Sequence, residues 1–143
     1  MRRLRGEVFL SHASRDRAFV ERLAGTFDSH RIPDFYSKRA IKGAQQWHDE
    51  LGAALGRCEW FALVLTPKAV ASIWVKRELL FALQAKRYRD RILPLLLESC
   101  TSKKLSWTLS QFQYIDFRSK RDDGIRELLS VLTAKQATPK RAP

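Results

Sequence analysis

Trp60-Phe61-Ala62-Leu63-Val64-Leu65 is the stretch of sequence that decides the fold. The run is apolar at every position, which is typical of a β-strand covered by other elements on both faces. Thr66-Pro67 follows directly, and a threonine can cap the amino end of a helix whose first position is a proline. The sequence therefore predicts a buried central strand that leads at once into a helix over 68–87.

Shorter apolar runs lie on either side of this strand and alternate with segments of helical periodicity. Further strands are predicted at 7–10, 32–36, 92–97 and 114–117. Apolar residues that recur every three or four positions predict helices over 15–29, 44–57 and 122–132. Ser14 and Asp122 are the expected amino-terminal caps of the first and last of these helices. The segment 99–110 is expected to be irregular.

The alternation of strands and helices implies parallel strands joined by right-handed crossovers. We therefore predict an α/β fold, a flavodoxin-like doubly wound five-stranded parallel sheet in the order 2-1-3-4-5 with helices on both faces. In a sheet of this order, ligands bind beyond the carboxyl ends of strands 1 and 3, where the order reverses. Those ends carry Ser11, His12 and Ala13 on one side and Thr66 on the other.

The length and composition fit one small domain. The chain has 143 residues, of which 45% are hydrophobic, enough to bury a single core. We expect a basic lead at 1–6, a domain over 7–134 and a flexible tail over 135–143. No apolar run reaches the roughly 18–20 residues that span a bilayer, so we expect a cytoplasmic protein with no membrane partner. Cys58 and Cys100 lack a CxxC partner; we expect two buried thiols and neither a metal site nor a disulfide.

The chain is strongly basic, with 27 Lys and Arg against 15 Asp and Glu and a net charge of +12. Such a surface would suit a nucleic acid or a phosphate-bearing small substrate. The basic residues are scattered, however, and no helix-turn-helix, zinc-finger or stacking-aromatic signature accompanies them. Specific nucleic-acid binding is therefore not expected. Glycine-rich phosphate loops and His/Cys metal motifs are also lacking from the sequence, so we expect no metal.

One carboxylate interrupts an apolar face of the helix predicted after the central strand. Glu78 occupies the missing position of a series whose other members are Ala71, Trp74, Phe81, Ala82 and Ala85. Burying an ionised glutamate is unfavourable unless it is paired, so this position needs an explanation. The structural explanation is a salt bridge with a nearby arginine, or a place at the rim. The functional explanation is an acid or electrostatic stabiliser beside the ring of Trp74.

Three pieces of the sequence together resemble a TIR (Toll/interleukin-1 receptor) domain of the bacterial kind. The first is Val8-Phe9-Leu10-Ser11-His12-Ala13-Ser14 near the start. The second is Tyr36-Ser37-Lys38-Arg39-Ala40-Ile41-Lys42-Gly43, which is similar to the BB loop of that family and is followed by Trp47. The third is Ser72-Ile73-Trp74-Val75-Lys76-Arg77-Glu78-Leu79, which is similar to the family's Ser-x-Trp-x-x-x-Glu motif. The resemblance extends from about residue 7 to 132.

The resemblance implies a flavodoxin-like fold and cleavage of the nicotinamide–ribose bond of NAD⁺. The products would be nicotinamide with either ADP-ribose or a cyclic ADP-ribose isomer, and NAD⁺ would be a substrate, with no cofactor. Glu78 matches the essential catalytic glutamate of enzymatic members. The residues expected to bind substrate are Ser11, His12, Ala13, Tyr36, Ser37, Lys38, Ile41, Gly43, Thr66, Ser72 and Trp74. Ser37 departs from the family, which often has aspartate there, and this weakens any acidic role for the loop.

The resemblance also implies partners. TIR domains stack head to tail, so we expect an active homo-oligomer assembled through the BB loop at 37–43. We expect a stand-alone domain in bacterial antiviral defence, with its trigger supplied by assembly or by a separate activator or effector protein. The alternative is a non-catalytic TIR adaptor that acts only by self-association. A third possibility, a phosphate- or nucleic-acid-binding module, rests on charge alone.

Overall fold

The computed structural model describes residues 6–37 and 44–134. In this part of the chain, five parallel strands form a single sheet in the order β2-β1-β3-β4-β5. The strands are β1 (Val8–Ser11), β2 (Asp34–Tyr36), β3 (Trp60–Leu65), β4 (Ile92–Leu96) and β5 (Ile115–Asp116). The predicted fold class and strand order are confirmed. The predicted lead at 1–6, apart from Gly6, and the tail at 135–143 lie outside the described residues.

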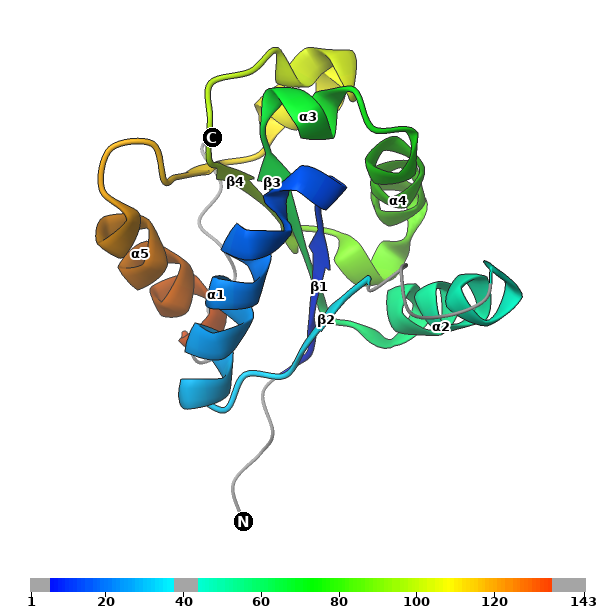
Figure 1. Cartoon of the computed structure of the whole chain (residues 1–143), viewed down its shortest axis with the longest axis horizontal. Coiled ribbons are helices and arrows are strands. Elements are labelled where there is room, and N and C mark those ends of the chain that lie inside the picture. Colours follow the sequence, from blue (N-terminus) through cyan, green and yellow to red (C-terminus); the bar gives the residue numbers. More distant parts are fainter. Residues whose placement is uncertain (1–5, 38–43, 135–143) are drawn as a thin grey trace.

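Helices cover both faces of the sheet. They are α1 (Arg17–Ser29), α2 (Ala44–Arg57), α3 (Pro67–Val70), α4 (Ile73–Gln84) and α5 (Arg121–Thr133). Figure 1 shows α1 and α5 on one side of the strands and α2 and α4 on the other. Short 3₁₀ turns complete the connections at Ser14–Asp16, Lys86–Tyr88, Ser102–Lys104 and Trp107–Gln111. The segment 99–110, expected to be irregular, therefore contains two of these turns.

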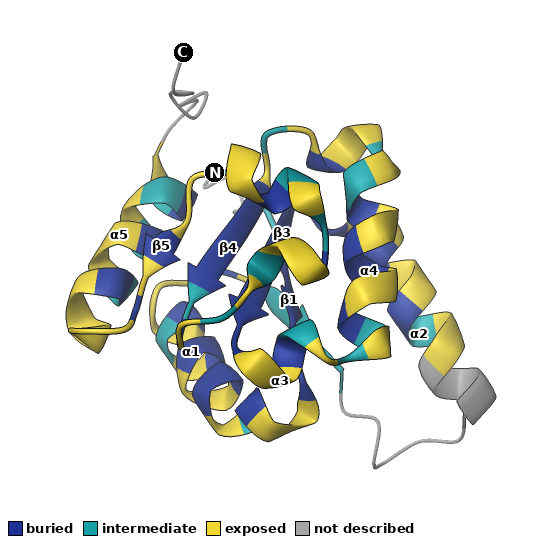
Figure 2. Ribbon diagram, turned by 90° about the horizontal axis from the view of Figure 1, so that it is seen from above, coloured by how far each residue is buried: buried dark blue, intermediate teal, exposed yellow. Residues whose placement is uncertain are grey.

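The central strand β3 divides the core into two layers because its alternate residues point to opposite faces. Trp60, Ala62 and Val64 pack with the side chains of α1 and α5. Phe61, Leu63 and Leu65 pack with those of α2 and α4. All six side chains are buried, as predicted for a strand covered on both faces (Figure 2). Both faces of the sheet are thus covered by helices, which leaves the ends of the strands as the places where a site can form.

Pro94 lies in β4, a central strand, without breaking the sheet. The carbonyl of Leu96 accepts from the Phe117 amide at 2.8 Å, so Leu96 directs its polar groups toward β5. Alternate residues of a strand direct their polar groups to the same neighbour, so Pro94 also faces β5. The first residue of β4 that pairs with β5 is Leu95, one residue after Pro94. The missing amide of the proline therefore costs no hydrogen bond to β5.

The predicted single helix over 68–87 is wrong, because the chain forms two helices. Thr66 caps α3 as expected, and its hydroxyl oxygen accepts from the Ala69 amide at 3.1 Å. After Ala71 the backbone turns extended at Ser72, whose hydroxyl accepts from the Val75 amide at 3.2 Å and caps α4. A second N-cap thus opens a second helix within the apolar pattern.

Two other predicted caps are also wrong. Ser14 opens a 3₁₀ turn, and α1 begins after Asp16 with no side-chain hydrogen bond at its cap. Asp122 lies inside the first turn of α5, where Lys120 holds the cap position without a side-chain bond. An acidic side chain in that turn still interacts favourably with the helix dipole.

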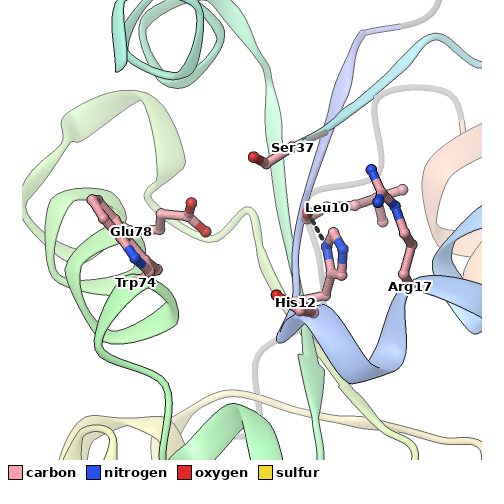
Figure 3. Close-up of a pocket in the computed structure, with 7 residues that line it drawn as sticks. Leu10, His12, Arg17, Ser37, Trp74 and Glu78 are labelled. Atoms are coloured by element: carbon pink, nitrogen blue, oxygen red, sulfur yellow. Dashed lines mark hydrogen bonds between the residues drawn. The ribbon is translucent and has the colours of Figure 1, made fainter. Parts of the chain in front are cut away.

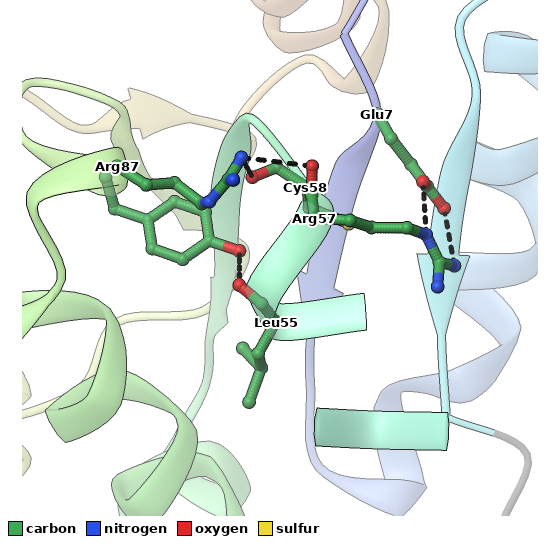
Figure 4. Close-up of polar contacts among 6 residues, drawn as sticks. Glu7, Leu55, Arg57, Cys58 and Arg87 are labelled. Atoms are coloured by element: carbon green, nitrogen blue, oxygen red, sulfur yellow. Dashed lines mark hydrogen bonds and ion pairs between the residues drawn. The ribbon is translucent and has the colours of Figure 1, made fainter. Parts of the chain in front are cut away.

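Polar contacts at the amino ends of the strands hold α2 against the sheet (Figure 4). Arg57 pairs with Glu7 at 2.8 Å, and Arg87 donates to the carbonyl oxygen of Cys58 at 3.1 Å. The Tyr88 hydroxyl donates to the Leu55 carbonyl at 2.6 Å. The amino ends of the strands are therefore fixed by their own contacts, and they lie opposite the carboxyl end of β1, where Ser11 is.

The expectation of two buried thiols is correct only for Cys58. Cys58 is fully buried, and burial raises the pKa of its thiol to about 12. Cys100 is half-buried, and burial raises its pKa as well. Neither cysteine forms a disulfide.

Among the described residues, no helix is both long and apolar enough to cross a membrane.

Gly124 provides a test of the packing between α5 and the sheet. A Cβ added there would lie 2.7 Å from Cδ2 of the fully buried Phe117 ring, whereas one added at Gly25 would meet nothing within 4 Å. We expect Gly124→Ala to lower the free energy of unfolding by about 1–3 kcal/mol. Gly25→Ala, the matched helical control, should raise it by roughly 0.5–1 kcal/mol. Urea denaturation of both variants measures the difference, and equal effects would contradict this packing.

Candidate functional site

A cavity of about 350 Å³ opens at the carboxyl end of β1. Its size lies at the lower end of the ~300–1,000 Å³ range of small-molecule pockets. The position matches the predicted crevice where the strand order reverses. Seven residues line it: Leu10, His12, Ser14, Arg17, Ser37, Trp74 and Glu78 (Figure 3).

Glu78 is the buried carboxylate of this cavity. The residue exposes 7% of its surface, and its Oε1 accepts a hydrogen bond of 2.7 Å from the Ser11 hydroxyl. Ser11 is itself 1% exposed at the end of β1. The bond joins α4 to the sheet across 67 positions of sequence. The prediction that a carboxylate occupies the buried face of this helix is confirmed, and the alternative of a place at the exposed rim is excluded.

The packing of α4 sets the direction of Glu78. Val75, Leu79 and Ala82 are buried with it and press the helix onto the sheet. The predicted apolar face was partly wrong, since Ala71 is exposed and Phe81 is 47% exposed. The helix is rotated so that Glu78 lies between Val75 and Leu79 on the buried side. This rotation aims the carboxylate at the end of β1.

Trp74 stands one turn before Glu78 on α4. It is half-buried and lines the cavity, and the Arg77 guanidinium lies 5.1 Å from the centre of its ring. A cation over an aromatic face is attracted to it by about 0.5–1 kcal/mol at exposed sites, which favours this orientation of the ring. The cavity thus has an aromatic wall beside its carboxylate.

His12 and Arg17 form the opposite wall. His12 follows β1, and its Nδ1 lies 3.3 Å from the Leu10 carbonyl oxygen, a distance that suits an Nδ1–H donor. Its ring meets that of Tyr36 edge-on, with centroids 6.2 Å apart. Arg17 is the first residue of α1, and Figure 3 shows its side chain on the far side of His12 from Glu78. One end of the cavity is therefore acidic and aromatic, and the other carries a cation.

Thr66 is buried outside the cavity, where its hydroxyl connects two segments of the chain. Its side chain is 1% exposed, and its hydroxyl donates to Oδ2 of Asp16 at 2.6 Å while accepting from the Ala69 amide. Asp16 is itself buried, with 9% exposure. The pair joins the start of α1 to the start of α3 and fixes the connection after β1, which lines the cavity through His12 and Ser14.

The structure brings together part of the predicted set. His12, Ser37, Trp74 and Glu78 line the cavity, and Ser11 reaches it through Glu78. Four other predicted residues do not line it: Ala13, Tyr36, Thr66 and Ser72. Lys38, Ile41 and Gly43 lie outside the described residues.

Three lining residues were not predicted as site residues: Leu10, Ser14 and Arg17. The available signal was the spacing of Ser14 and Arg17, because side chains three apart in a helical turn share one face. Within the described ranges, no group of three or more His, Cys, Asp or Glu side chains is placed to hold a metal ion.

The Ser11–Glu78 bond makes a testable contribution to stability. Ser11→Ala should lower the free energy of unfolding by about 1–3 kcal/mol, because the buried carboxylate loses a hydrogen-bond donor. In a protein that already carries Glu78→Ala, adding Ser11→Ala should lower the free energy of unfolding by clearly less. Urea denaturation of the two single variants and the double variant gives the coupling. Additive losses would show that the two side chains do not interact.

Comparison with known proteins places this architecture in a family. The family model for the TIR domain matches residues 8–129. A search of curated proteins finds no match. The TIR domain of the Toll-related receptor TRR-2 from Hydra magnipapillata is similar in structure, with a TM-score of 0.73 and 19% identity over 89% of this chain and 98% of that one.

Two further solved structures share the fold. The TIR domains of the activated Roq1 resistosome, which recognises the pathogen effector XopQ, give a TM-score of 0.67 at 16% identity and cover 88% of this chain and 98% of that one. A TIR-STING receptor from C. gigas, solved with 2',3'-cGAMP, gives 0.67 at 20% identity and covers 88% of this chain but 40% of that one. At such identities the likeness concerns the fold, and the family match rests on the sequence. The chain belongs to the TIR-domain family.

Proposed function

We propose that this chain is an NAD⁺ glycohydrolase or cyclase that breaks the nicotinamide–ribose bond, and that it acts as a bacterial TIR protein in cytoplasmic antiviral defence. The observation that carries the proposal is Glu78, a carboxylate that is 93% buried yet lines a cavity beside Trp74 and is held by Ser11. A purely structural helix would gain stability from an apolar residue at this position. The TIR motifs found in the sequence supply the substrate class.

The reaction suits a site with one carboxylate. The bond between the nicotinamide nitrogen and C1′ of the ribose breaks, and its electron pair leaves with nicotinamide, which becomes neutral. The ribose then carries positive charge spread over C1′ and its ring oxygen. Because nicotinamide is already a cationic leaving group, no proton has to be donated to it.

Glu78 would stabilise this developing charge. A carboxylate in a partly dehydrated cavity interacts strongly with a nearby cation, since little water screens the pair. The Ser11 hydroxyl, 2.7 Å from Oε1, holds the side chain in place at the wall of the cavity, where it would face the ribose. The indole of Trp74 offers a face to the cationic nicotinamide ring.

The product depends on which nucleophile attacks C1′. Attack by water gives ADP-ribose and releases one proton to Glu78 or to solvent. Attack by an adenine nitrogen of the same molecule gives a cyclic ADP-ribose isomer. Glu78 would orient either nucleophile in the position that nicotinamide leaves.

A second candidate function, a TIR adaptor that acts through self-association, is favoured by one observation. The outer side of α4 exposes Ile73, Leu80 and Phe81 by 56%, 43% and 47% of their surface. Apolar side chains gathered in this way are typical of protein contact surfaces. A contact surface of this kind suits the non-catalytic adaptor and the assembled form of the proposed enzyme alike, so the cleavage assay decides between them.

Removal of the carboxylate tests the proposed chemistry. The protein is incubated with NAD⁺ at high concentration, and nicotinamide and ADP-ribose products are followed by chromatography and mass spectrometry. Glu78→Ala should lower the rate by about 100-fold or more, as loss of a transition-state stabiliser does. Glu98→Ala, which removes an exposed carboxylate outside the cavity, should leave the rate unchanged. Equal rates in all three proteins would rule out this role for Glu78.

Assembly is tested by the dependence of rate on concentration. We propose head-to-tail stacking through 37–43, with a separate activator or effector protein as a possible partner. Specific activity should then rise with protein concentration and with a crowding agent. Light scattering in the same samples reports assembly. A specific activity that stays constant while the protein assembles would separate the two processes.

A further inference from the structure

Arg17 is the one cationic side chain among the described residues that line the cavity. It is the first residue of α1 and lines the cavity with His12 and Ser14. Its Nε is buried, and within residues 6–37 and 44–134 this atom has no hydrogen-bond partner. Arg17 forms an ion pair with Glu21 one turn along α1, at 3.8 Å, which is beyond hydrogen-bond distance. The two side chains are 36% and 55% exposed, so this pair is solvated and weak.

A buried Nε–H without an acceptor is unfavourable, even on a side chain whose other atoms reach solvent, and a ligand that supplies the acceptor removes that penalty. The guanidinium presents its donors in a planar fork, which matches two oxygens of a phosphate group. An anion with oxygen acceptors is therefore the ligand chemistry that this wall favours.

The cavity has opposite charges at its two ends. Figure 3 shows Glu78 and Trp74 entering from α4 and Arg17 entering from α1, with His12 between them. NAD⁺ has the matching polarity, because its nicotinamide is cationic and its pyrophosphate is anionic. Only one direction of binding pairs both ends with opposite charges.

We propose that Arg17 binds the pyrophosphate of the substrate and thereby fixes its direction, with the nicotinamide ribose at Glu78. This inference rests on the proposed function and adds a specificity residue to it. Because Arg17 contacts phosphate and not the reacting C1′, it would select phosphorylated nicotinamide compounds over the free riboside.

The test compares two substrates that carry the same scissile bond. Values of kcat/KM are measured for NAD⁺ and for nicotinamide riboside, which lacks phosphate. Arg17→Gln should lower kcat/KM for NAD⁺ by about 10- to 100-fold, the usual value of a hydrogen bond to a charged group. The same change should lower kcat/KM for nicotinamide riboside by less than about threefold. Arg17→Lys keeps the charge but loses the planar fork of donors, so its kcat/KM for NAD⁺ should lie between those of the unaltered protein and Arg17→Gln.

Arg22→Gln is the matched control, since it removes an exposed arginine from the same helix, away from the cavity. It should leave the ratio of the two kcat/KM values unchanged. Equal losses on both substrates with Arg17→Gln, or no loss on either, would overturn the inference while the proposed function stands. Circular dichroism confirms that the compared variants are folded.

A binding measurement separates this inference from the activity. Titration calorimetry with ADP-ribose should show about tenfold weaker binding to Arg17→Gln than to the unaltered protein or to Arg22→Gln. Binding that depends on Arg17 in a protein that does not cleave NAD⁺ would support the anion site and contradict the proposed function. Binding of equal strength in all three proteins would contradict the anion site.

Discussion

The hydrogen bond between Ser11 and Glu78 is the interaction on which the account of this molecule depends. A glutamate that exposes only 7% of its surface needs a partner, and the 2.7 Å contact supplies one from the end of β1. The same contact ties α4 to the sheet and presents the carboxylate to the cavity. Stability and chemistry therefore share one geometry, because whatever holds α4 in place also positions Glu78.

The two ends of the sheet have different tasks. At the amino ends of the strands, Glu7 pairs with Arg57 and Tyr88 binds the carbonyl of Leu55, so α2 is fixed by contacts that take no part in the site. At the carboxyl ends, the buried Asp16–Thr66 pair holds the connection after β1, which lines the cavity. The polar groups that face the cavity itself, on α4 and at the start of α1, are thus positioned by a frame that does not depend on ligand.

The sequence predicted the strand order, because β3 is apolar throughout and helical segments separate the strands. It also predicted Glu78, because a carboxylate interrupts an apolar helical pattern. The break at Ser72 was missed, since an apolar pattern continues across it and only the capping serine marks the new helix. Arg17 was missed for another reason. Its place in the cavity depends on how the turn after β1 directs α1, and that direction is set by packing between distant segments.

A crystal structure of the Glu78→Gln protein with NAD⁺ would show whether the substrate places its reacting ribose at this carboxylate position. The change keeps the size of the side chain and removes the charge that would stabilise the reacting ribose, so intact substrate should remain bound. The nicotinamide ribose should lie beside residue 78 and Trp74, with C1′ exposed to the cavity and the pyrophosphate at Arg17. NAD⁺ bound at another surface, or bound with its pyrophosphate beside residue 78, would contradict this placement.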